Sequence, residues 1–381
     1  WWRYHKAYLE LMEYIGQYRD GLELAQFALH QISGNEEASA LLRWQAVFFR
    51  HMGHYQEASE CVERALAWDV SDEERLHLLQ EGGKIKLAQG RYSAALESYR
   101  EAMAWAVSRN DQAKQGILSG LIGQVLYQRG EFEAARNHFA KAIDLATEVG
   151  DNRAVAGALC KIGALELDEG DIKASLQRFE KAISLTRELG DRRMECKALA
   201  LLGQLQSDRR LYDEGREQFE LALDYAKQLG DIRGEGEFLA RLGAICYFTG
   251  EHDTSRLYLE EGLQKTVYVG DHATEIWIRG FLNVVEFVLH NRNTEETIEE
   301  MERTMHMSEE IEAMEIILLC KILSGHIFRL LNQRGRALDQ LTAARYLAIE
   351  IGNRRMLAKI ESERYLLDKH KGRVWGLQQT L

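Results

Sequence analysis

The chain has 381 residues, of which 46% are hydrophobic and 28% charged, as is usual for a folded soluble protein. Its formal net charge of −12 disfavours a nucleic-acid backbone or an anionic membrane as the main partner, because both attract basic surfaces. No apolar run approaches the roughly 18 to 20 residues of a membrane span, and no signal-peptide pattern opens the chain. We therefore expect neither nucleic acid nor a membrane among its partners.

The usage of cysteine and proline limits the fold further. The five cysteines are odd in number and scattered, with no disulfide framework and no metal knuckle, so we expect a reducing, cytoplasmic setting and no cofactor. Proline is absent. Because proline breaks helices and marks loops, its absence predicts a nearly continuous helical chain with short turns. The chain begins at Trp1 without a methionine, which we interpret as a segment of a longer polypeptide.

The predicted elements are helical hairpins that follow one another along the chain. Recurring glycine and alanine positions delimit nine of them, at 2–33, 35–70, 72–109, 111–150, 151–190, 191–230, 231–270, 271–312 and 313–352. A final helix at about 354–369 and a tail make up the last unit, 353–381. No linker or low-complexity segment interrupts the series, so we predict a single domain, 1–381, in which the hairpins stack in a row.

The hairpins between 111 and 270 repeat with a step of forty residues. Each first helix carries a hydrophobic residue followed by glycine, and each hairpin ends on glycine followed by aspartate: Ile122-Gly123, Ile162-Gly163, Leu202-Gly203 and Leu242-Gly243, then Gly150-Asp151, Gly190-Asp191, Gly230-Asp231 and Gly270-Asp271. Apolar residues recur in between at three- and four-residue steps, which predicts amphipathic helices. Gly150 suits the left-handed residue after a helix, and Asp151 can cap the next helix.

This pattern resembles the tetratricopeptide repeat, in which an L-G pair is followed, after the turn, by A-x-x-x-F. Ile122-Gly123 with Ala135 and Phe139 matches that motif. Gly-Asp replaces the usual proline, and the longer unit is similar to the long-helix class found in polarity adaptors, kinesin light chains and bacterial signalling proteins. The resemblance covers nearly the whole chain. It implies an all-α fold, an α-solenoid in which the hairpins form a right-handed superhelix.

In tetratricopeptide superhelices the first helix of each hairpin lines the concave surface, and the resemblance implies the same here. Positions −6, −3, +1 and +4 from the repeat glycine lie on one face of that helix. The partner-binding residues expected on this stripe are Lys84, Gln124, Tyr127, Lys197, Gln204 and Tyr247.

The −3 position of the stripe is uniformly small, and it allows two interpretations. Gly120, Cys160, Ala200 and Ala240 either widen a groove for a helix or an extended segment, or let neighbouring first helices pack closely. Asparagine is missing directly after the repeat glycine. The sequence therefore disfavours the carboxylate clamp known from tetratricopeptide adaptors of chaperones.

Charged residues supply two further candidates. The unit 271–312 has lost its repeat glycine to Asn283 and carries an acidic stretch. Its candidate site for a basic partner segment consists of Glu295, Glu296, Glu299 and Glu300. A solvated helix face explains the same pattern. Two residues after three of the turn aspartates stands an arginine, and we expect ion pairs along one edge from Arg153, Arg193 and Arg233.

Motifs for catalysis are absent from the sequence. It contains no P-loop, no H-E-x-x-H zinc motif and no G-x-S-x-G elbow. His51 and His54 form a lone H-x-x-H without a third ligand nearby, so we expect no metal there. Cys160 and Cys196 are expected to be packing residues and not activated thiols.

We therefore predict a non-enzymatic, cytoplasmic scaffold whose concave face binds a protein or peptide segment. We expect it to be part of a larger bacterial signalling or defence protein with flanking domains. Two alternatives stay open. In the first, the array senses a small molecule or a signalling peptide for a regulator; in the second, it is a structural oligomerisation arm that uses Trp1 and Trp2.

Overall fold

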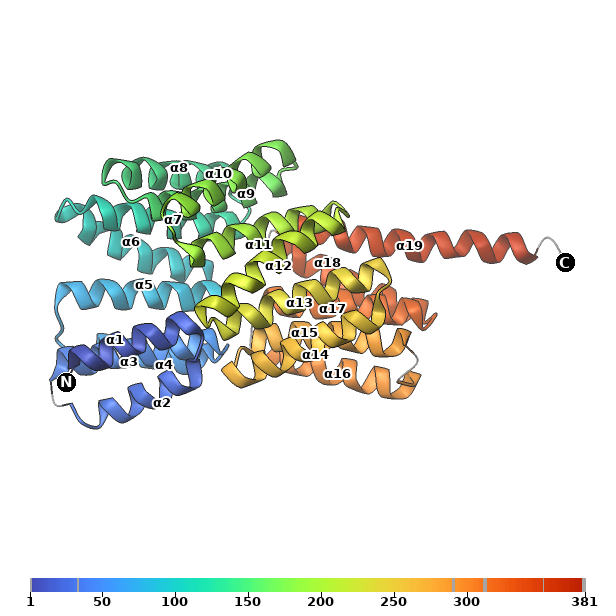
Figure 1. Cartoon of the computed structure of the whole chain (residues 1–381), viewed down its shortest axis with the longest axis horizontal. Coiled ribbons are helices and arrows are strands. Elements are labelled where there is room, and N and C mark those ends of the chain that lie inside the picture. The colour runs from blue at the N-terminus through green and yellow to red at the C-terminus, as the bar shows by residue number, and fades with distance from the viewer. Residues whose placement is uncertain (1, 33, 290–291, 311–313, 352, 379–381) are drawn as a thin grey trace.

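The computed structural model describes residues 2–32, 34–289, 292–310, 314–351 and 353–378. Within these ranges the chain forms 19 helices and no strand (Figure 1). The first helices of the hairpins are α1 (Trp2–Ile15), α3 (Asn35–His51), α5 (Asp72–Ala88), α7 (Gln112–Gln128), α9 (Asn152–Asp168), α11 (Arg192–Asp208), α13 (Ile232–Thr249), α15 (His272–Val288) and α17 (Met314–Leu330). The second helices are α2 (Tyr18–Leu29), α4 (Tyr55–Leu66), α6 (Tyr92–Ser108), α8 (Phe132–Glu148), α10 (Ile172–Glu188), α12 (Tyr212–Leu229), α14 (His252–Val269), α16 (Thr294–Glu310) and α18 (Arg334–Glu350). The predicted all-α solenoid is confirmed.

The last helix, α19 (Arg354–Gln378), is longer than the sequence predicted. It was expected to end near residue 369, where Lys369 begins a polar tail. The tail contains no proline, and each of its two glycines, Gly372 and Gly376, costs a helix only about 1 kcal/mol, so nothing local stops it there. Trp1 lies outside the described residues, as does the side chain of Trp2, so the oligomerisation arm stays a prediction.

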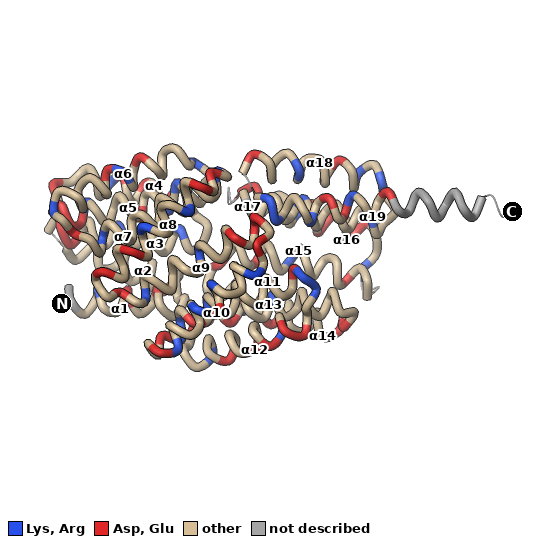
Figure 2. Tube along the Cα trace, turned by 90° about the horizontal axis from the view of Figure 1, so that it is seen from above, with Lys and Arg blue, Asp and Glu red and all other residues tan. Residues whose placement is uncertain are grey.

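The hairpins stack in two layers. Each first helix packs against the second helix that follows it, and that second helix packs against the first helix of the next hairpin. Several consecutive first helices also pack directly, as α3 does on α5 and α9 on α11, whereas no two second helices in the described part of the chain pack to that extent. The row therefore curves with its first helices inside. Figure 2 shows α1–α8 at one end of the molecule, α14–α19 at the other, and α9–α13 between them.

Each regular hairpin is closed by a contact between the repeat glycine and a large side chain of the second helix. In α9 a Cβ atom on Gly163 would lie 2.6 Å from Cε1 of Phe179, whose side chain is fully buried. Gly123 faces Phe139 in the same way in the preceding hairpin. The glycine is therefore required because the aromatic ring occupies the space of its missing side chain.

The turns between hairpins have the geometry that the Gly-Asp pairs predict. Gly150 has a φ of 72°, in the left-handed region, and ends α8. Asp151 then caps α9, because its carboxylate accepts a hydrogen bond from the backbone N–H of Ala154 at 2.9 Å. Asp191, Asp231 and Asp271 cap the following first helices by the same kind of bond.

Replacing Arg210 by glycine is expected to stabilise the chain by about 0.5–1 kcal/mol. Arg210 has a φ of 63°, a conformation that glycine adopts at the equivalent turn positions Gly130, Gly170 and Gly250. Removing its Cβ relieves the steric cost of the left-handed region, and the greater freedom of glycine in the unfolded chain offsets only part of this gain. Chemical denaturation measures the effect. Asn332→Gly is the matched control and should gain less, because asparagine tolerates this conformation (φ 58°); a loss of stability in Arg210→Gly would contradict the prediction.

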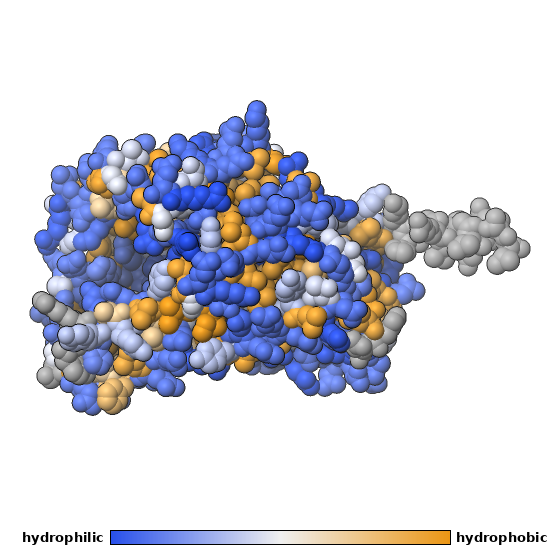
Figure 3. Space-filling model, viewed as in Figure 1, coloured by the Kyte–Doolittle hydropathy of each residue, from blue (hydrophilic) through white to orange (hydrophobic). Residues whose placement is uncertain are grey.

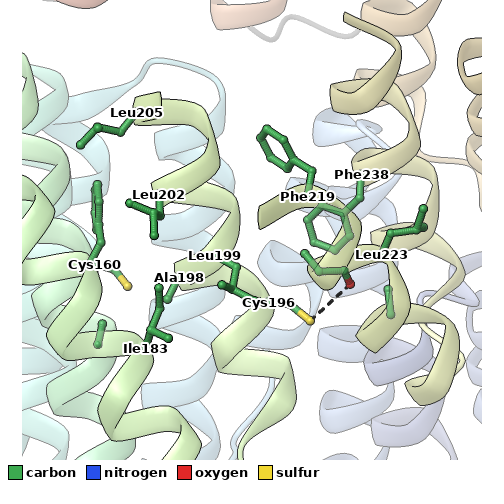
Figure 4. Close-up of a cluster of buried hydrophobic side chains, with 14 of the residues drawn as sticks. Cys160, Ile183, Cys196, Ala198, Leu199, Leu202, Leu205, Phe219, Leu223 and Phe238 are labelled. Carbon is green, nitrogen blue, oxygen red and sulfur yellow. Dashed lines mark hydrogen bonds between the residues drawn. The ribbon is translucent and has the colours of Figure 1, made fainter. Parts of the chain in front are cut away.

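Buried side chains form a seam between the two layers. In the middle of the array this seam includes Leu199 and Phe219 (Figure 4). The thiol of Cys196 lies in it and donates to the carbonyl oxygen of Ala222 at 3.7 Å. Burial raises the pKa of Cys160 and Cys196 to about 12, so both stay protonated thiols, as expected of packing residues.

The irregular unit at 271–312 replaces the glycine contact with hydrogen bonds. Asn283 in α15 is buried, and its amide donates to the carbonyl oxygen of Thr297 in α16 at 3.0 Å. Arg292 in the turn donates to the Asn283 amide oxygen at 2.9 Å. This hairpin is therefore joined by polar contacts at the place where its neighbours use a glycine and an aromatic ring.

Candidate functional site: the concave face

The concave side of the superhelix is partly enclosed, because the two ends of the array reach the first helices of its middle. Figure 3 shows the surface hollowed on the left, between the N-terminal helices and the segment that contains α7 and α9. The first helices α11 and α13 contact the N-terminal hairpins with the N-terminal ends of their own helices. The C-terminal end of α11 contacts α19.

The contact with the N-terminal hairpins is a chain of buried polar groups. Arg233 in α13 donates to Asp271 at 2.8 Å, and Asp271 is only 1% exposed. Tyr18 in α2 lies next to this pair, and its ring stacks on His51 in α3 with centroids 4.6 Å apart. Burial, followed by Arg50 and Arg233, holds the pKa of His51 well below its usual value, so the ring is neutral. Residues from the first two hairpins are thereby held against the seventh hairpin and the start of the eighth.

Two of the three edge arginines pair as expected, and the third does not. Arg153 lies 2.7 Å from Asp191, and Arg233 pairs with Asp271. Arg193 makes no ion pair with a described residue, and its guanidinium lies 4.4 Å from the ring centroid of Tyr14 in α1. The prediction is therefore wrong for Arg193: closure of the superhelix places an aromatic ring beside it.

The contact with α19 lies at the other end of the same first helices. Lys359 pairs with Asp208 in α11 at 3.0 Å, and Arg355 lies 3.7 Å from the same carboxylate. Arg354 lies 4.5 Å from the ring centroid of Phe132 at the start of α8. The last helix thus covers the C-terminal ends of α7–α11 without following them in the row.

Three of the predicted binding residues are engaged within the chain. The hydroxyl of Tyr127 donates to Asp168. Gln204 donates to Asp208 at 2.9 Å and accepts a hydrogen bond from Arg241 at 2.8 Å. The hydroxyl of Tyr247 lies 2.8 Å from a ring nitrogen of His326, and burial raises its pKa to about 12. Their roles in partner binding stay predictions, and each would have to exchange these contacts for a ligand.

The other three predicted residues are more available. Gln124 is partly exposed, and Lys197 is exposed, and neither hydrogen bonds to another described side chain. Lys84 is 43% exposed and lies 3.0 Å from Glu81. Arg50 also binds this carboxylate, and although burial opposes ionisation of Glu81, the two cations outweigh it and lower its pKa to about 2.

Sequence reasoning missed Lys161, the most unusual residue of the concave face. It lies in α9, two residues before the repeat glycine, and its ammonium donates to the carbonyl oxygen of Gly120 in α7 at 3.2 Å. Burial, followed by Lys197 and Lys84, lowers its pKa to about 8. The stripe predicted from the sequence does not include this position, two residues before the repeat glycine. Glu81 and Arg241 occupy the same position of their helices, and a charged residue there in an otherwise apolar helix could have indicated a functional role.

The candidate acidic patch lies on α16, away from this face. Glu295 and Glu299 are exposed, and Arg303 lies 3.0 Å from Glu299 and 3.2 Å from Glu300. Glu296 takes part in a reciprocal cap at the start of the helix: its backbone N–H donates to Asn293, and its carboxylate accepts from the Asn293 N–H. Binding of a basic segment here stays a prediction.

A pocket of about 310 Å³ lies where the second hairpin meets α15 and α16. His54 and His272 line it, with ring centroids 5.3 Å apart. His51 is stacked on Tyr18 instead, so the H-x-x-H pair does not point to one centre. Among the described residues, no group of three His, Cys, Asp or Glu side chains is placed to hold a metal ion.

Comparisons with known proteins agree with this architecture. Residues 114–188 match the family model of the tetratricopeptide repeat. A Rap protein complexed with Competence and Sporulation Factor is similar over 93% of this chain and 99% of its own, with 13% identity and a TM-score of 0.66. The Rap conjugation gene regulator of plasmid pLS20, in complex with the Phr* peptide, is 15% identical over 91% and 95% of the two chains (TM-score 0.59). Aspartyl phosphate phosphatase F from Bacillus subtilis is 12% identical over 90% and 93% (TM-score 0.61).

These findings show a tetratricopeptide-type repeat in the middle hairpins and a helical-repeat fold over most of the chain. The repeat motif is matched in the middle hairpins, and the solved structures share the fold over nearly the full length of the chain. None of the curated proteins matches the sequence. Of the helices in the described part, none combines the length and the apolar character needed to cross a membrane.

Proposed function

We propose that the chain is a sensor module that binds a peptide segment in the hollow of its concave face. The observation that carries this proposal is the set of polar side chains on that face without a charged partner, Lys161 and Lys197 above all. A scaffold that only stacked hairpins would gain nothing from unpaired cations in a partly enclosed surface, because their desolvation is unfavourable. An extended peptide offers the carbonyl and carboxylate acceptors that these side chains lack.

The structural neighbours support the sensor version of the predicted scaffold. One is complexed with Competence and Sporulation Factor and another with the Phr* peptide. The proposed module has no enzymatic step. Because another neighbour is an aspartyl phosphate phosphatase, release of phosphate from an aspartyl-phosphate protein by this chain would contradict that part.

We also propose that the module works in the cytoplasm, within a longer regulatory protein. All five cysteines are free and buried, which suits a reducing compartment. The flanking domains stay a prediction from the sequence. In this proposal the contacts that the N-terminal hairpins and α19 make with the middle first helices, the closure contacts, change when the peptide binds. The reason is that a ligand that favours one superhelical curvature shifts the equilibrium between curvatures.

The full chain is expected to bind members of a synthetic octapeptide library, measured by fluorescence anisotropy. Gln124→Trp on the concave face should abolish or strongly weaken this binding, because a larger, uncharged side chain fills the hollow. The matched control is Gln177→Trp in α10, on a second helix, which should bind as the wild-type chain does. Binding that survives Gln124→Trp would place the peptide elsewhere, and absence of binding to the whole library would overturn the proposed function.

A further inference from the structure

Several cations of the first helices lack a carboxylate partner, although the whole chain has a net charge of −12. Within the described residues neither Lys161 nor Lys197 makes an ion pair with a carboxylate, and Lys84 shares Glu81 with Arg50. Arg193, near Lys197, is also without an ion pair in the described part of the chain.

The three lysines belong to three first helices of the inner layer, α5, α9 and α11. Lys84 is one residue after the repeat glycine of α5, Lys161 two residues before that of α9, and Lys197 six residues before that of α11. Lys161 extends to the Gly120 carbonyl oxygen of α7, so its ammonium lies between the helix that carries Lys84 and the helix that carries Lys197. The electrostatic influence of Lys84 and Lys197 on Lys161 agrees with that placement.

The central ammonium lies beside a glycine. A Cβ atom at Gly120 would lie 3.6 Å from the Lys161 nitrogen and 3.8 Å from the Cβ atom of Ala142, at ordinary contact distance from both. Lys161 extends across α7 and uses one donor on the Gly120 carbonyl oxygen. An ammonium has three donors, so two remain for a ligand that approaches from the hollow.

We propose that Lys84, Lys161 and Lys197 form a carboxylate subsite, which receives the C-terminal carboxylate or an acidic side chain of the bound peptide. This inference rests on the proposed function. An anion placed between ammonium groups relieves their mutual repulsion, and charge-assisted hydrogen bonds are stronger than neutral ones. The lysines come from three different positions of the repeat, with no asparagine among them, so the arrangement differs from the chaperone-adaptor clamp that the sequence disfavours.

The test uses the full chain and pairs of synthetic octapeptides that differ in one group. Each peptide is made as a free acid and as a C-terminal amide, and each with glutamate or glutamine at one internal position. In the pair that differs at the bound group, the peptide with the carboxylate is expected to bind about tenfold more tightly than the peptide with the amide. That difference is the size of one charge-assisted hydrogen bond. The amide pairs and the glutamine pairs distinguish a terminal from a side-chain carboxylate.

Lys161→Met and Lys197→Met each remove a charge and keep most of the side-chain volume. Each is expected to weaken binding of the carboxylate peptides about tenfold and to leave the neutral peptides unaffected. The Tm of Lys161→Met should stay the same or rise, because the fold disfavours the charged form of this lysine. Lys181→Met, at an exposed position of α10, is the control and should change neither property.

The outcomes separate the subsite from the function on which it rests. Equal binding of charged and neutral peptides, unaffected by both substitutions, would overturn the subsite and leave peptide binding intact. If no peptide of either kind binds the wild-type chain, the proposed function fails, and the subsite fails with it.

Discussion

Phe179→Ala is expected to lower the free energy of unfolding by about 3–5 kcal/mol, the largest effect of any single change considered for this chain. The ring of Phe179 is fully buried in the seam and fills the space above Gly163. Its removal leaves a cavity between two helices that cannot collapse, because the neighbouring hairpins hold them from both sides. Denaturant titration followed by circular dichroism measures the loss.

Stability in a repeat array is nearly a sum of local contributions, so the loss should also be local. Hydrogen exchange is expected to speed up in α9 and α10 and to change little in α17 and α18. Leu257→Ala in α14 is the control, because this side chain is 62% exposed and its removal should cost less than about 0.5 kcal/mol. A cost for Phe179→Ala near that of the control would show that the glycine–aromatic contact does not stabilise the hairpin.

Arg233→Met is expected to cost about 2–3 kcal/mol and to release the N-terminal hairpins. The substitution leaves the carboxylate of Asp271 buried without its cation, although the cap to Thr274 compensates part of the loss. The arginine side chain is 38% exposed, which keeps the effect below that of a fully buried pair. Hydrogen exchange should accelerate in α1–α3, while exchange in α7–α10 stays the same.

Arg153→Met provides the matched control for this closure contact. Arg153 occupies the same repeat position and pairs with Asp191, but it is 61% exposed and its partner is not fully buried. Its loss should cost no more than about 1 kcal/mol and should not affect α1–α3. Equal effects of the two substitutions would mean that the Arg233 contact is an ordinary edge pair and does not hold the superhelix closed.

The sequence predicted the hairpins well because their determinants lie within one repeat. Gly150 and Asp151 fix a turn through their own backbone conformation and a bond across three residues. Gly163 and Phe179 belong to the same hairpin, so a fixed spacing is enough to predict their contact. The irregular unit was also visible in the sequence, because Asn283 takes the place of the repeat glycine, and in the structure it makes a different contact, with the carbonyl oxygen of Thr297.

The candidate site was predicted only in part. The stripe predicted from helical periodicity includes Gln124 and Lys197, which are at least partly exposed to a ligand. It also includes Tyr247, whose hydroxyl contacts His326 of a later hairpin. It missed Lys161, because that side chain belongs to the next position around the helix and reaches the face by extending over Gly120. Helical periodicity predicts the face on which a side chain begins, whereas the end of a long side chain can lie over a neighbouring face.

By itself the sequence determined the repeat unit, its caps and its glycine–aromatic contacts, because each depends on residues fewer than forty positions apart. Only the tertiary structure decided that the superhelix closes, with Tyr18 beside Arg233 and Lys359 on Asp208. The curvature of a solenoid is the sum of small rotations between hairpins, and no single repeat encodes that sum. The hollow and its unpaired lysines follow from this curvature, so they become visible only once all the hairpins are in place.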